Sequence, residues 1–222
     1  MHNNLSKKKN GFFEKIKLGD HICSIYNNKK QQFSVIVPFF KAGLSNNEKC
    51  IYTTEENSKE EVLLEFKKNR IDVDKYIKLN QLVILTKDET YLKNRSFDAS
   101  WMIEFLKKTE QEVIKEGYNG IRISGEATCV CENSKDNSKF MEYESQVNSI
   151  FPRIKVAAVC QYNENILKPE ILAEAIHTHP YLVIYGNHHE NMYYSPAESI
   201  DKAHKLPSAY YEIIRDSIIK ED

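Results

Sequence analysis

Glycine is scarce in this chain, with 7 among 222 residues, and none lies where a phosphate-binding loop would need it. Such a loop requires glycines in the turn after the first strand of an α/β domain, so that backbone N–H groups can wrap a phosphate. The turn expected here, residues 27–31, reads Asn-Asn-Lys-Lys-Gln. The fourth expected strand also ends in Ser124 before Gly125, without the aspartate that holds magnesium in nucleotide hydrolases. Both absences argue against nucleotide hydrolysis.

An excess of charge and long apolar runs are missing too. The 31 basic and 32 acidic side chains nearly cancel, which leaves no electrostatic footprint for nucleic acid, and direct DNA or RNA binding is not expected. No segment approaches the roughly 20 apolar residues that span a bilayer, and no apolar stretch follows the basic N-terminus. The 5 cysteines form no regular framework, which indicates reduced thiols. We therefore expect a cytoplasmic protein without a membrane anchor.

From Gly19 onward, apolar runs of strand length alternate with amphipathic runs of helix length, which is the pattern of repeated βα units. Several of the shorter runs are almost continuously apolar, as strands covered on both faces are. The predicted strands are His21–Tyr26, Lys49–Thr53, Gln81–Thr86, Gly120–Ser124, Val156–Tyr162 and Tyr181–Tyr185. The predicted helices are Gln32–Leu44, Lys59–Lys68, Ala99–Glu116, Lys139–Ile150 and Pro169–His177. The fold class is therefore α/β, with a mainly parallel sheet and helices on both faces.

The chain divides into three parts. Residues 1–17 are polar and rich in Lys and Asn, which predicts a flexible lead-in. Residues 18–200 form the globular domain. Residues 201–222 predict a helical extension, with apolar residues at helical spacing between Tyr210 and Ile218. This extension either packs on the domain or docks a partner, and both alternatives stay open.

The carboxyl ends of the strands are where open α/β sheets collect their ligands. Glu55 follows the second strand, and Glu126 follows Gly125, which permits close backbone approach. Either carboxylate could contact a ligand or act as a base, and either could belong to an ordinary turn or helix lead-in. Tyrosines such as Tyr143 and Tyr162 would give a pocket apolar walls with hydroxyl groups.

Four histidines gather near the C-terminal end of the domain. His177 and His179 lie at a predicted helix end, where His177 favours the negative end of the helix dipole. His188 and His189 are placed in a loop. His179 and one of the loop pair remain candidates for contact with a ligand or metal.

Three cysteines, Cys129, Cys131 and Cys160, could converge near the same edge of the sheet. Zinc sites usually use wider spacing than Cys-x-Cys, and a cysteine in an apolar strand is commonly a small hydrophobic residue. We therefore assign no metal, no cofactor and no catalytic residue.

A set of short strings gives the chain a more specific character through its order and spacing. The strings are GDHICSIYNNKKQ, PFFKAGLSNNEKCIYTTEEN, ETYL, FDASWMI, ISGEATCV, YESQVN, VCQYN and THPYLVIYGN. Together they resemble the MEDS family, the methanogen and methylotroph sensory domain named after a regulator of dichloromethane use. The resemblance covers about residues 18–200.

The resemblance implies a three-layer, RecA- or KaiC-like fold without a functional P-loop. It also implies an input domain that senses small hydrocarbon derivatives beside DNA-binding or histidine-kinase modules. The aromatic residue that the family usually places soon after its Gly-Glu pair is Cys129 here, which alters one pocket wall. The matching signature positions are His21, Tyr52, Glu55, Tyr91, Gly125, Glu126, Tyr143, Glu144, Asn148, Cys160, Tyr162, His179 and Pro180.

From these observations we expect a non-catalytic sensor of a small organic ligand, either a one-carbon compound or a hydrocarbon derivative. We expect a stand-alone domain that acts through a partner histidine kinase or transcription regulator, and a homodimer is a further option. The alternatives are a residual nucleotide-binding or metal-dependent enzyme that uses Glu126 and histidines, and an interaction adaptor that docks through its last helix. The expected ligand-binding residues are His21, Glu55, Glu126, Tyr143, Glu144, Asn148, Tyr162 and His179.

Overall fold

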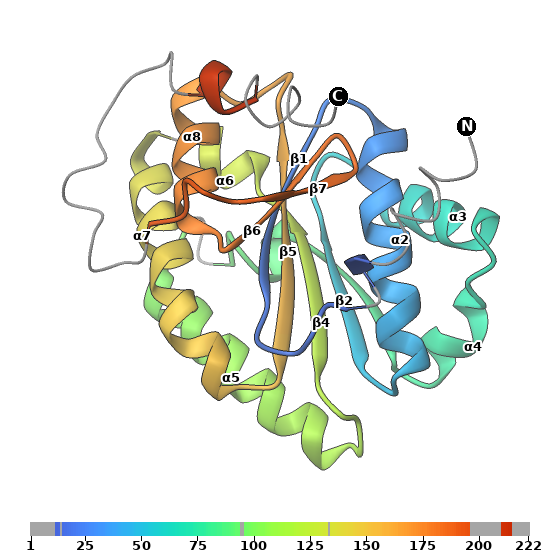
Figure 1. Ribbon diagram of the computed structural model, residues 1–222. Helices are drawn as coiled ribbons and strands as arrows, with labels where there is room; N and C mark the ends of the chain where they lie inside the picture. Colours follow the sequence, from blue (N-terminus) through green and yellow to red (C-terminus); the bar gives the residue numbers. More distant parts are fainter. Residues whose placement is uncertain (1–11, 14, 94–95, 133, 196–209, 215–222) are drawn as a thin grey trace.

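The computed structural model describes residues 12–13, 15–93, 96–132, 134–195 and 210–214 (Figure 1). The strands are β1 (His21–Tyr26), β2 (Lys49–Thr54), β3 (Leu82–Thr86), β4 (Ile121–Glu126), β5 (Val156–Asn163), β6 (Tyr181–Ile184) and β7 (Asn187–Glu190). The α-helices are α2 (Lys29–Ser45), α3 (Lys59–Lys68), α4 (Val73–Lys78), α5 (Ala99–Lys115), α6 (Thr128–Glu132), α7 (Ser134–Ile150) and α8 (Pro169–Thr178). Short 3-10 turns follow β3 at Lys87–Glu89 and α7 at Phe151–Arg153.

One sheet joins the strands in the order β3-β2-β4-β5-β1-β6-β7. All neighbouring pairs are parallel except β6 and β7, which are antiparallel. Helices α2, α3 and α4 lie on one side of the sheet, and α5, α7 and α8 lie on the other (Figure 1). The predicted class, a mainly parallel sheet between two helical layers, is confirmed.

The two-residue period of the strands sorts their side chains between two cores. In β1, Cys23 and Ile25 belong to the core under α5, α7 and α8, whereas Ile22 belongs to the core under α2 and α3. His21 shares the face of Cys23 by the same alternation. Because β1 pairs with β5 in parallel, with Cys23 opposite Cys160, the side chains of these two strands face α7 and α8 together.

The predicted loop around His188 and His189 is wrong, because both residues lie on β7, where His189 is opposite Leu182 and His188 is opposite Val183. Tyr185 and Gly186 form the turn between β6 and β7, and both have positive φ, 51° and 84°. Two central residues of positive φ suit a two-residue hairpin, since their twist matches that of the strands. The polar sequence of β7 gave no alternating pattern by which to detect it.

Both ends of the domain extend the packing beyond the predicted limits. Phe13 and Ile16 are buried, and Phe12 stacks on His188 with ring centroids 3.8 Å apart, so the last residues of the expected flexible lead-in instead pack on the domain. Tyr210 is also buried, and its hydroxyl donates to Glu164 at 2.8 Å. Residues 210–214 therefore pack on the domain. The rest of the predicted C-terminal helix lies outside the described residues. Within the described part of the chain, no helix is both long and apolar enough to cross a membrane.

Candidate functional site

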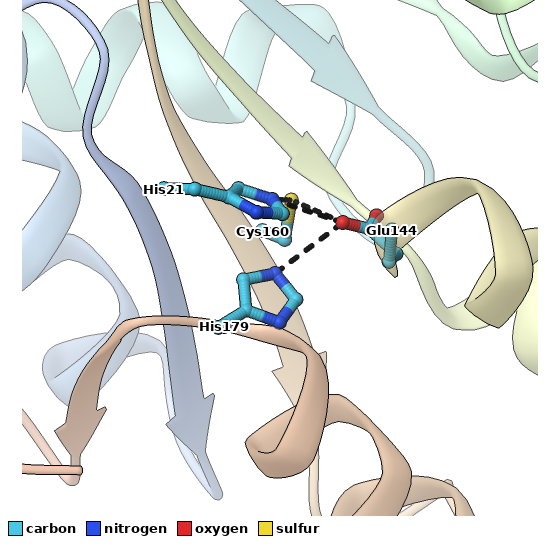
Figure 2. Close-up of side chains that lie close together, drawn as sticks. All are labelled: His21, Glu144, Cys160 and His179. Atoms are coloured by element: carbon cyan, nitrogen blue, oxygen red, sulfur yellow. Dashed lines mark hydrogen bonds and ion pairs between the residues drawn. The ribbon is translucent and has the colours of Figure 1, made fainter. Parts of the chain in front are cut away.

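Four buried polar side chains meet on the face of the sheet beneath α7 and α8 (Figure 2). We call His21, Glu144, Cys160 and His179 the histidine–glutamate cluster; each offers one ligand atom, and these atoms all lie within 4.8 Å of one another. Glu144 Oε2 is 2.9 Å from His21 Nε2, 3.3 Å from His179 Nε2 and 3.6 Å from Cys160 Sγ. His21 Nε2 is also 3.4 Å from Cys160 Sγ. The cluster is therefore compact and withdrawn from solvent.

The cluster does not lie at the carboxyl edge, where the sequence placed the site. His21 is the first residue of β1, and His179 directly follows α8 before β6 begins, so both lie toward the amino ends of their strands. Cys160 lies within β5, and Glu144 reaches the sheet from α7. The expectation was wrong for these residues because the covering helices, and not the strand ends, supply half of the cluster.

Hydrogen bonds on the outer side of each imidazole fix its orientation. Asn148 Nδ2 donates to the backbone carbonyls of Glu144 (3.2 Å) and Thr178 (2.6 Å), which leaves its Oδ1 to accept from His21 Nδ1 at 2.9 Å. His179 Nδ1 lies 2.7 Å from the carbonyl oxygen of Ala175, which can only accept. Both rings therefore carry a proton on Nδ1, and their Nε2 atoms point to Glu144.

The electrostatics of the cluster reflect this arrangement. Burial raises the pKa of Glu144, but the contacts with His179 and His21 lower it more, to about 2, so the carboxyl group is ionised. Burial, and then the neighbouring His21, lowers the pKa of His179, which favours the neutral imidazole. Burial and the Glu144 charge raise the pKa of Cys160 well above that of a free thiol. The Glu144 carboxylate is thus a buried negative charge whose Oε2 faces both imidazoles and the Cys160 sulfur.

A partly open cavity of about 40 Å³ reaches the cluster. His21, Glu144 and Cys160 line its polar end, and α5 contributes apolar walls that include Met102 and Leu106. The cavity also reaches Tyr91, Gly125 and Tyr143. Tyr91 packs so closely on Gly125 that a Cβ there would lie 1.9 Å from the Tyr91 hydroxyl oxygen, which explains why this position requires glycine.

Glu126 belongs to a separate network at the carboxyl edge between β2 and β4. Its Oε2 accepts from three successive backbone N–H groups, those of Glu55 (2.7 Å), Glu56 (2.5 Å) and Asn57 (3.1 Å). Its Oε1 accepts from the Tyr52 hydroxyl and from Asn57 Nδ2, both at 2.6 Å. Glu126 is fully buried, so these donors, which tie the loop after β2 to the end of β4, use its hydrogen-bonding capacity.

The structure thus divides the eight expected ligand-binding residues. His21, Glu144, Asn148 and His179 come together, and Tyr143 lines the adjoining cavity. Tyr162 lies beside the cluster, with its ring centroid 5.8 Å from that of His179, and its buried hydroxyl has no hydrogen-bond partner. Glu55 and Glu126 lie apart from the cluster, at the carboxyl edge.

Cys160 was not among the expected ligand-binding residues, although it lies in the cluster. The signal for it is the register of β1 with β5, which puts Cys160 on the face of His21. Cys129 and Cys131 lie on α6 and contribute no ligand atom to the cluster.

Comparison with known proteins gives first the class and then the family. The solved structure of the flagellar accessory protein FlaH from Methanocaldococcus jannaschii, a RecA-like protein, matches with a TM-score of 0.55 at 16% identity, covering 82% of this chain and 76% of that one. The chain therefore has a RecA-like α/β fold. The model of the MEDS family, the MEthanogen/methylotroph, DcmR Sensory domain, matches residues 20–180, and the chain belongs to this family. No match is found among curated proteins.

Proposed function

We propose that this sensory domain binds a small organic molecule in the cavity beneath α5 and α7. The observation that carries the proposal is a cavity of about 40 Å³ with largely apolar walls and a polar end at His21, Glu144 and Cys160. A single water needs about 10–15 Å³ on the same kind of measure, so the cavity suits a ligand of a few heavy atoms. A one-carbon compound or a short hydrocarbon derivative fits this size, and a nucleotide does not.

Signalling would follow from a shift between two conformations without catalysis. Helix α7 carries Tyr143 and Glu144 to the cavity, and Glu144 also contacts His179, which directly follows α8, so a ligand beside Glu144 adjoins the junction of two helices and the sheet. A ligand that binds one packing of these helices more tightly shifts the population toward it. Within this proposal, a partner histidine kinase or transcription regulator reads the shift at the surface of the domain.

A thermal-shift screen of the full chain tests the proposal. The compounds are methylamines, small thiols, short alcohols and halomethanes, with ATP and magnesium as a comparator. At 100 times its Kd a ligand stabilises by about 2.7 kcal/mol, which raises Tm by roughly 5–11 °C in a domain of this size. Stabilisation by one class of small compound supports the proposal. Stabilisation by ATP and magnesium alone would contradict it.

A pair of variants on α5 shows whether the cavity is responsible. Leu106 lines the cavity, whereas Val113 is buried on the same helix away from it. Leu106→Phe should abolish the ligand-induced shift because the larger ring fills the space. Val113→Ile, which adds a methylene elsewhere in the same core, should keep the shift. Equal responses in both variants would place the ligand outside this cavity.

A further inference from the structure

The inner sides of the two imidazoles in the histidine–glutamate cluster converge on one carboxylate oxygen. The bonds of Asn148 and Ala175 engage the Nδ1 atoms, so His21 Nε2 and His179 Nε2 both point to Glu144 Oε2, at 2.9 and 3.3 Å. His179 is fully buried, and its Nε2 has no hydrogen-bond partner. The Cys160 thiol can donate its single proton to one neighbour at a time. A divalent ion among these atoms would engage both Nε2 atoms, the carboxylate and the sulfur at once.

We propose that His21, Glu144, Cys160 and His179 form a binding site for one divalent transition-metal ion, with zinc as the best match. A tetrahedral zinc site has bonds of about 2.0–2.3 Å, which places neighbouring ligand atoms roughly 3.3–3.8 Å apart. Three of the separations in the cluster, 3.3, 3.4 and 3.6 Å, fall in this range. A fourth separation, 2.9 Å between His21 Nε2 and Glu144 Oε2, needs a small opening to admit the ion, and the two that remain, from His179 to His21 and to Cys160, are within 4.8 Å.

The charges and donor atoms also suit this class of metal. Glu144 and a Cys160 thiolate together carry two negative charges, which a divalent ion neutralises, so the loaded site is neutral in the protein interior. The thiol proton of Cys160 leaves to solvent as the ion binds. Two imidazoles and one sulfur favour zinc or a neighbouring transition metal, because magnesium and calcium prefer oxygen ligands.

The outer contacts of the histidines match those of metal ligands. A histidine that binds a metal through one nitrogen commonly donates the other N–H to a carbonyl or carboxylate, which fixes the ring. Asn148 Oδ1 serves His21 in this way, and the Ala175 carbonyl serves His179. Asn148 is thus a positioning residue, and Asn148→Ala should weaken zinc binding about 10- to 100-fold.

Metal binding by the purified full chain tests the site. After chelator treatment and dialysis, wild type should bind one equivalent of zinc, and cobalt(II) in its place should give the near-ultraviolet charge-transfer band of a cobalt–thiolate bond. Cys160→Ser should lose this band. The control is Cys50→Ser, since Cys50 is also buried on a strand but faces the other core. This variant should keep both the band and the stoichiometry.

Three outcomes would overturn the site: wild type that binds no stoichiometric zinc, a cobalt–thiolate band that survives Cys160→Ser, or equal loss of the band in both cysteine variants. If Cys160→Ser fails to fold, X-ray absorption of the zinc-loaded wild type decides, with one sulfur at about 2.3 Å and lighter ligands at about 2.0–2.1 Å expected. A shell of oxygen and nitrogen alone excludes the site. The inference rests on the cluster itself, so absence of zinc binding would leave the small-molecule proposal standing, and absence of an organic ligand would leave the metal site standing.

Discussion

Two buried glutamates, Glu126 and Glu144, lie on the same domain in opposite surroundings. Glu126 ends β4 at the carboxyl edge, and each of its oxygens accepts hydrogen bonds from several donors, three of them backbone N–H groups. Glu144 projects from α7, and its Oε2 faces two imidazole nitrogens and a sulfur. Both side chains are at most 1% exposed, so solvent compensates neither charge.

The difference shows which of two buried carboxylates has a structural role and which is available for binding. Donors already use the capacity of Glu126, so a ligand could reach it only by breaking bonds that hold the loop after β2. Glu144 Oε2 meets two imidazole nitrogens and a sulfur, which are the atoms that bind transition metals, so a metal ion could share it without breaking a bond that holds a loop. The enzyme alternative that relied on Glu126 therefore loses its base, whereas the histidines remain able to bind.

The largest effect should come from Glu126→Gln. The amide NH₂ would face donors that now point at a carboxylate, and bonds to a charged group are worth about 1.5–3 kcal/mol each. We expect a loss of about 3 kcal/mol or more in the free energy of unfolding, measured by denaturant titration, with or without zinc. Glu112→Gln, at an exposed site on α5, is the control and should change stability by less than about 0.5 kcal/mol. If Glu126→Gln proves as stable as that control, the structural role of Glu126 is wrong.

A smaller effect is expected at Gly125, which precedes Glu126 and also lines the cavity. In Gly125→Ala the new methyl group would lie 1.9 Å from the Tyr91 hydroxyl oxygen, so the ring must move. Overpacking of this kind costs about 1–3 kcal/mol, and the displaced ring should also reduce the ligand-induced thermal shift.

The double variant Gly125→Ala with Tyr91→Phe separates the clash from other consequences of the new side chain. Removing the hydroxyl takes away the closest atom, so the double variant should recover part of the lost stability relative to Gly125→Ala. Simple addition of the two single effects would mean that Tyr91 does not constrain this position.

Sequence patterns were sufficient for most of the fold because burial on both faces leaves apolar runs that are easy to recognise. All six predicted strands are present, with ends shifted by at most two residues. Strand β7 was missed because pairing with β6, and not an apolar pattern, holds it in place. The helices α4 and α6, with 6 and 5 residues, are too short for a periodic pattern to identify.

The site was harder to predict because it depends on sheet order. The rule that polar residues after strands meet at the carboxyl edge was right for Glu55 and Glu126. It could not bring His21 and His179 together, since one opens β1 and the other precedes β6. Their proximity follows from the adjacency of β1 and β6, which sequence periodicity does not contain. The resemblance to the family named both residues but gave no reason for their meeting.

The smallest effect on the metal-free protein is expected for Glu144→Gln, which completes the comparison. The amide keeps the size of the side chain and removes its charge, and it can donate to His179 Nε2, which has no hydrogen-bond partner in wild type. In chelator-treated protein we expect a smaller loss in the free energy of unfolding than in Glu126→Gln, because the contacts of Glu144 Oε2 are two imidazoles and a sulfur and not three backbone N–H groups. The stabilisation that zinc gives to wild type should disappear, because the amide neither supplies the negative charge nor binds zinc as a carboxylate does. Denaturant titration with and without zinc measures both quantities, and a large loss in the chelator-treated variant would show that Glu144, like Glu126, is a structural carboxylate.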